Sequence, residues 1–119
     1  MVLRNAPLRL MKLPKQIRRL QLLQLAMGPQ TTLSQASMLL LIAEKPNITA
    51  SELAKEVGLT LAAVSRFVAV MSKGRKGAKT PGRRLVIAKQ DPDDDRVKLL
   101  QLTEHGKAVL AVLQEVKAA

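Results

Sequence analysis

The sequence predicts a mainly α-helical fold with one small β-hairpin. Three observations predict this fold class. Residues 49–73 contain two short helix patterns joined by a glycine, residues 85–102 contain two β-prone runs around an acidic turn, and apolar residues recur at helical spacing in the flanking segments. With 119 residues, of which 47% are apolar, the chain fits one domain with a modest core.

The chain is expected to divide into a basic N-terminal arm, residues 1–13, and a single domain, residues 14–119. The arm is rich in leucine but has no helical period. It ends before Pro14, a residue that suits the first turn of a helix. From there Ile17, Leu20 and Met27 mark a helix, which the Gly28-Pro29 pair ends.

A second helix is expected to begin after Thr32. Thr32 and Gln35 have the spacing of a capping box, and residues 38–43 are apolar almost all round, which predicts a buried helix. Pro46 ends this helix, because the residue before a proline disfavours the helical state. This longest apolar run is far too short to span a membrane.

Residues 49–73 predict two short helices around a tight turn. Thr49 and Glu52 can form another capping box, Gly58 can adopt the left-handed conformation that ends a helix, and Thr60 can cap the next one. The apolar face of this second helix is expected to be Leu61, Val64, Phe67, Val68 and Met71. Two such helices form a helix-turn-helix, whose second helix enters the DNA major groove.

The opposite face of that second helix is small, hydroxylated and basic. The side chains expected to contact DNA are Thr60, Ala62, Ala63, Ser65 and Arg66. Small side chains let the backbone approach base edges, while the serine and the arginine can donate hydrogen bonds to phosphates or bases. The alternative is an ordinary helical hairpin inside a core.

Positive charge is concentrated in and just after this helix. The formal net charge is +11, and residues 61–90 hold eight basic and no acidic side chains. Residues 73–84 form a basic, glycine-containing loop without a Walker motif, and its expected DNA contacts are Lys73, Arg75, Lys76, Lys79, Arg83 and Arg84. The alternative is a solvated basic surface. The basic arm could touch DNA, pair with a second subunit or be disordered.

A β-hairpin is expected directly after the loop, over residues 85–102. Residues 85–89 and 97–102 are β-prone, and the Asp-rich segment 91–96 between them has turn chemistry. Thr103 can cap a last helix, which carries a stripe of valine and leucine. A hairpin that follows a helix-turn-helix is a wing, so the predicted architecture is a winged helix-turn-helix.

Three local sequence matches resemble the MarR family of winged-helix transcriptional regulators. They are TLSQ at 32–35, AVSR at 63–66 and DDDRVKLLQLTEHG at 93–106, in which Asp94, Arg96, Leu102, Thr103 and Gly106 occupy the family's D-x-R…LT-x-x-G positions. The resemblance implies a homodimer that binds a pseudo-palindromic operator in double-stranded DNA. It also implies that Arg96 lies at the minor groove and that Asp94 helps to hold it.

The chain departs from the family pattern at the wing. Asp95 occupies a position that is often basic in the family, and the 73–84 loop is longer than the usual connection. We therefore expect DNA contact to be partly moved from the wing to the loop.

The sequence offers little catalytic or metal-binding chemistry. It has no cysteine, and neither its one histidine, His105, nor the Asp cluster at 91–95 has the spacing of a metal site. No catalytic triad can be assembled. We therefore expect no enzyme activity, no cofactor and no metal. The absence of cysteine and of a signal peptide fits a cytoplasmic protein.

The leading interpretation is a sequence-specific regulator of transcription, acting as a repressor. It would read the major groove with residues 61–72 and the flanking backbone or minor groove with the loop and wing. One alternative is a winged-helix protein for replication, segregation or DNA architecture of a plasmid or phage, and another is a basic protein-interaction module. Family members often bind small ligands, but with one aromatic residue no strong response to phenolic compounds is expected, and the sequence identifies no inducer.

Overall fold

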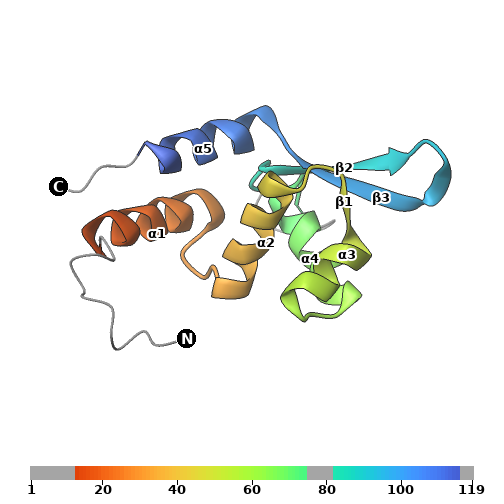
Figure 1. Cartoon of the computed structure of the whole chain (residues 1–119), viewed down its shortest axis with the longest axis horizontal. Helices are drawn as coiled ribbons and strands as arrows, with labels where there is room; N and C mark the ends of the chain where they lie inside the picture. The colour runs from red at the N-terminus through yellow and green to blue at the C-terminus, as the bar shows by residue number, and fades with distance from the viewer. Residues whose placement is uncertain (1–12, 75–81, 116–119) are drawn as a thin grey trace.

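A computed structural model describes residues 13–74 and 82–115 as a helical domain with one small sheet (Figure 1). The elements are, in chain order, α1 (Leu13–Met27), α2 (Leu33–Glu44), β1 (Ile48–Thr49), α3 (Ala50–Val57), α4 (Leu61–Met71), β2 (Val86–Asp91), β3 (Asp94–Leu102) and α5 (Glu104–Gln114). The predicted class, mainly α with a winged helix-turn-helix, is confirmed.

The predicted helix caps form because threonine side chains replace the missing helical hydrogen bonds. Thr32 with Gln35, and Thr49 with Glu52, make complete capping boxes at α2 and α3. Gly58 ends α3 with a left-handed φ of 71°, and the Thr60 side chain accepts a hydrogen bond from the Ala63 N–H at 3.1 Å. These caps fix where α4 begins.

The core lies between α2, α3, α4 and the sheet. Leu39, Leu53, Val64 and Leu85 are completely buried there, and Phe67 is buried beside them. At about 25 cal/mol for each Å² of apolar surface removed from water, such side chains supply the main stabilisation of the domain. The core therefore fastens one side of α4 to the domain.

Two predictions about buried faces are wrong. Helix α2 is not buried all round, because Leu33 and Leu40 are 79% and 43% exposed. Leu61 does not belong to the apolar face of α4, since it is 52% exposed at the first helical position. In contrast, Val64, Phe67 and Met71 are buried as predicted, and Val68 packs partly buried against the core.

The sheet has three antiparallel strands in the order β1-β3-β2. Strand β1, which the sequence did not predict, pairs Ile48 with Leu100 and Thr49 with Leu99. The hairpin also differs from the prediction: β3 begins at Asp94, so Asp94, Asp95 and Arg96 belong to a strand and only Pro92 and Asp93 form the turn. The wing therefore occupies the expected residues, but its two strands extend further toward the tip than predicted (Figure 1).

The base of the wing is joined to α4 and α5 through backbone contacts. Leu85 donates its N–H to the Met71 carbonyl at 2.7 Å and accepts from the Thr103 N–H at 3.0 Å. The Thr103 hydroxyl donates to the Arg84 carbonyl at 2.6 Å and accepts from the Gly106 N–H at 3.0 Å. A Cβ atom at Gly106 would lie only 2.3 Å from the Leu85 oxygen. These contacts give the LT-x-x-G spacing a structural reason.

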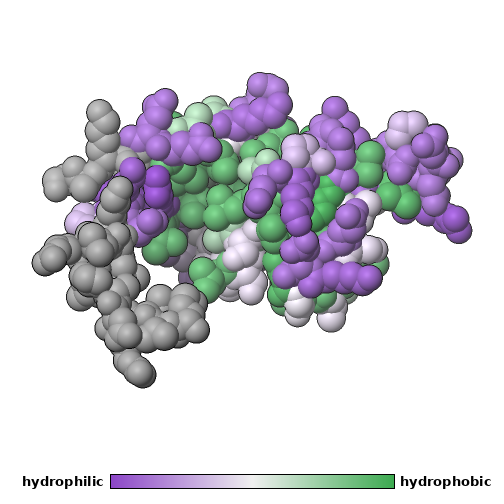
Figure 2. Space-filling view, viewed as in Figure 1, coloured by the Kyte–Doolittle hydropathy of each residue, from purple (hydrophilic) through white to green (hydrophobic). Residues whose placement is uncertain are grey.

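Helices α1 and α5 lie side by side, away from the wing (Figure 1). The Arg19 Nε donates to the Leu113 carbonyl at 3.1 Å and so ties the two helices together. Figure 2 shows hydrophobic surface between these helices, in contrast to the hydrophilic wing tip. Across the described ranges 13–74 and 82–115, every helix is too short or too polar to cross a membrane.

Candidate nucleic-acid interface

The exposed side of α4 is the centre of the candidate interface. Ala62, Ser65 and Arg66 are exposed, Ala63 is half-buried, and Thr60 is exposed at the cap. The opposite side is held in the core by Val64, Phe67 and Met71. A helix anchored in this way presents a face of small side chains with one hydroxyl and one guanidinium, which suits close approach to a groove.

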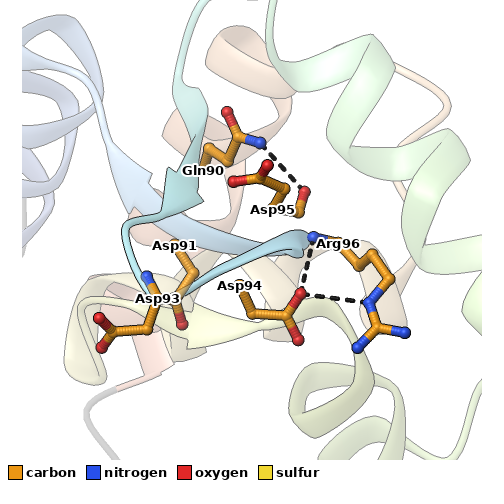
Figure 3. Close-up of polar contacts among 6 residues, drawn as sticks. All are labelled: Gln90, Asp91, Asp93, Asp94, Asp95 and Arg96. Atoms are coloured by element: carbon orange, nitrogen blue, oxygen red, sulfur yellow. Dashed lines mark hydrogen bonds and ion pairs between the residues drawn. The ribbon is translucent and has the colours of Figure 1, made fainter.

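The wing carries an arginine that is oriented by an aspartate (Figure 3). The Asp94 Oδ1 accepts from the Arg96 backbone N–H at 3.0 Å and from the Arg96 Nε at 3.2 Å. These two hydrogen bonds hold the pKa of the Asp94 carboxyl below its ordinary value. The Arg96 side chain is 90% exposed, so its remaining donors are free to reach an outside acceptor.

An irregular register in the hairpin places Arg96 at the tip. Gln90 pairs with Lys98, but the next pair is Asp91 with Asp94, so β3 carries three additional residues, 95–97, between these pairs. The Gln90 Nε2 donates to the Asp95 carbonyl at 3.2 Å and closes this bulge (Figure 3). Bulges of this kind redirect side chains, which accounts for the outward position of Arg96.

The wing tip is otherwise acidic. The Asp93 N–H donates to the Asp91 Oδ1 at 2.8 Å, an ordinary turn contact, and Asp95 is exposed. Within the described part of the chain, no three His, Cys, Asp or Glu side chains gather as a metal site. Apart from Arg96, the charged side chains of this tip are aspartates, which would repel phosphate groups.

The ends of the basic loop are closed by backbone contacts at the C-terminus of α4. The Gly82 N–H donates to the Lys73 carbonyl at 3.1 Å, and Arg83 and Arg84 donate to the carbonyls of Val70 and Ser72, both at 2.9 Å. A Cβ atom at Gly82 would lie 2.2 Å from the Gly74 nitrogen, so only glycine fits. Three predicted contacts, Arg75, Lys76 and Lys79, lie outside the described residues.

The three predicted basic contacts that the structure describes in this loop do not share one location. Lys73 is exposed one residue beyond the C-cap of α4. Arg84 is exposed and has a left-handed φ of 57°, which is uncommon for a residue with a long side chain. The guanidinium of Arg83 lies against Gly28 in the turn between α1 and α2. A Cβ atom added at Gly28 would lie 2.8 Å from a terminal nitrogen of this guanidinium. Arg83 therefore lies where the C-terminal end of α4 meets the turn between α1 and α2.

Sequence and structure comparisons agree on one family. A family model described as MarR family matches residues 31–73, which form α2, β1, α3 and α4. No curated protein sequence matches the chain significantly.

Several solved structures have the same fold. A mutant of E. coli MarR in complex with operator DNA is 27% identical, with a TM-score of 0.59 over 91% of this chain and 71% of that one. S. aureus MepR in complex with DNA is 18% identical, with a TM-score of 0.65 over 91% and 79%. Streptococcus pneumoniae FabT in complex with DNA is 20% identical, with a TM-score of 0.62 over 90% and 68%. With its helix-turn-helix and the family match across residues 31–73, the chain is similar to the MarR family and shares its fold with these solved structures.

Proposed function

We propose that this chain is a sequence-specific regulator of transcription that binds double-stranded DNA through α4 and the wing. The single observation that carries this proposal is the two-sided α4: one side is buried in the core, while Ala62, Ser65 and Arg66 lie open to a groove. Relatives with this fold have been solved with DNA. Members of this family regulate transcription and are not enzymes, and a cytoplasmic location suits the role.

The proposed assembly is a homodimer that acts as a repressor. Helices α1 and α5 leave large apolar side chains exposed: Ile17, Leu20, Leu25 and Val112. Apolar patches of this kind mark association surfaces, and most soluble oligomers are symmetric dimers. Two copies would present two α4 helices to half-sites about one helical turn apart.

Around α4, the wing and loop would supply sequence-independent contacts. Arg96, oriented by Asp94, is proposed to reach the minor groove. Lys73 and Arg84 are proposed to contact phosphates beside α4, together with Arg75, Lys76 and Lys79 of the loop. We leave Arg83 out of this set because its guanidinium lies at the turn between α1 and α2.

Selection of bound sequences from a random duplex pool at fixed salt tests this function. The expected result is an enriched, pseudo-palindromic site with two half-sites. Cooperative coating of long DNA without an enriched site would point instead to DNA architecture, replication or segregation. Absence of DNA binding at physiological salt would overturn the proposal in favour of a protein-interaction module.

A further inference from the structure

The exposed face of α4 has few polar side chains that could read bases. At about 100° per residue, Ala62, Arg66 and Ala69 lie along the outward face, and Leu61 and Ser65 lie at one edge of it. Leu61 is 52% exposed, and Ala62, Ser65 and Arg66 are exposed as well. Of these five side chains, three are apolar.

Leu61 has no structural reason to be apolar. It occupies the first position of α4, where the helix start is already fixed by the Thr60 cap, and it makes no part of the buried core. Among the described residues, the other large exposed apolar side chains lie on α1, α2, α5 and β2, except for Val70, which lies near the end of α4. Leu61 is thus the large apolar group at the N-terminal end, where a recognition helix meets base edges.

The major groove offers one apolar group to such a side chain. This group is the C5-methyl of thymine, whereas the other groups by which the bases are told apart in this groove are hydrogen-bond donors and acceptors. We propose that Leu61 packs against a thymine methyl and that the half-site combines this thymine with a guanine for Arg66, the commonest partner of arginine. This inference rests on the proposed function and names the sequence class that the same site reads.

Deoxyuridine substitution tests the inference, because it removes only the methyl group of thymine. In a duplex taken from the selected pool, replacing one particular thymine of a single half-site by deoxyuridine should weaken binding about fourfold, as expected for one buried methyl group. With Leu61→Ala, the same duplexes should bind with equal affinity. Because Leu61 is exposed, the variant should keep the wild-type melting temperature.

Val70→Ala is the matched control. Val70 is 37% exposed on the same helix but lies near its C-terminal end, so this variant should keep the fourfold response to deoxyuridine. The inference is overturned if no replacement of thymine by deoxyuridine weakens binding of the wild type. It is also overturned if such a replacement weakens binding of Leu61→Ala as much as binding of the wild type. Such a result leaves the proposed function standing, since a sequence would still have been selected. Failure to select any sequence would instead refute the proposed function itself.

Discussion

Gly106→Ala places a methyl group where α5 touches the backbone of Leu85. The new Cβ would lie 2.3 Å from the Leu85 carbonyl oxygen and 3.3 Å from the Leu102 Cβ. An ordinary contact requires the first distance to increase by about 1 Å. The oxygen cannot move freely, because it accepts the Thr103 N–H at 3.0 Å while the Leu85 N–H is bonded to Met71. Helix α5 must therefore shift away from the base of the wing.

Two opposing effects decide the sign of the change in stability. Replacing a helical glycine by alanine favours folding by about 1 kcal/mol through helix propensity, whereas overpacking costs about 1–3 kcal/mol and the shift also strains the Thr103 cap. We expect the contact to win, with a net loss of about 1–2 kcal/mol in the free energy of unfolding. At roughly 4 °C per kcal/mol, Tm should fall by about 4–8 °C.

Denaturant unfolding at one fixed protein concentration measures this loss, since association contributes to apparent stability. Ala108→Gly is the control: Ala108 is exposed on the same helix, so the variant reports the propensity effect alone, a loss of about 1 kcal/mol. If Gly106→Ala were as stable as wild type or more stable, propensity would outweigh the contact and the reasoning would be wrong.

Three further predictions concern the interface and the assembly. Neutralising the loop by Arg75→Ala, Lys76→Ala and Lys79→Ala combined should lower the magnitude of the slope of log affinity against log salt by about 5.4 for the dimer, because each lost phosphate contact removes about 0.9 and two chains lose six contacts. The slope is measured by fluorescence anisotropy, and an unchanged slope would exclude loop contacts. The pKa of the Asp94 carboxyl, followed by NMR, should lie below its ordinary value of 3.8 and should rise toward that value in Arg96→Ala. Because folding lowers this pKa, the contribution of Asp94 to stability is complete above the unfolded-state pKa and is lost as pH falls through the folded-state pKa. The stability of the wing should therefore be insensitive to pH between about 5 and 8. Leu25→Asp, at a side chain that is 78% exposed on α1, should shift a dimer toward monomer in sedimentation without unfolding the chain, and an unaltered dimer would place the interface elsewhere.

Local signals in the sequence were sufficient for most of the fold. Helices begin after Thr32, Thr49 and Thr60 because each threonine side chain accepts a hydrogen bond from the backbone N–H three residues later. Helix α3 ends at Gly58 because glycine adopts a positive φ without strain. Contacts across the chain could not be predicted in this way. Strand β1 has two residues, too few for a pattern, and it exists only because Leu99 and Leu100 of β3 pair with it.

The candidate site was predictable in its helix but less so in its loop. Helical spacing placed Ala62, Ser65 and Arg66 on the exposed face. The same spacing assigned Leu61 to the core wrongly, because Leu61 lies at the edge of the apolar stripe, beside the outward face, whereas Val64 in the same turn is buried. Composition grouped Arg83 with the other loop cations, whereas backbone bonds from residues 82–85 to the end of α4 direct it to the α1–α2 turn.

The specificity ratio of Arg66→Ala tests the central claim most directly. The measurement compares affinity for a selected duplex with affinity for random duplex at one salt concentration, in wild type, Arg66→Ala and Lys107→Ala, which removes the same charge from an exposed position on α5. We predict that the ratio falls about tenfold or more in Arg66→Ala, as the loss of one bidentate base contact implies, and stays at the wild-type value in Lys107→Ala. Equal ratios in all three proteins would contradict the claim that the exposed face of α4 reads DNA.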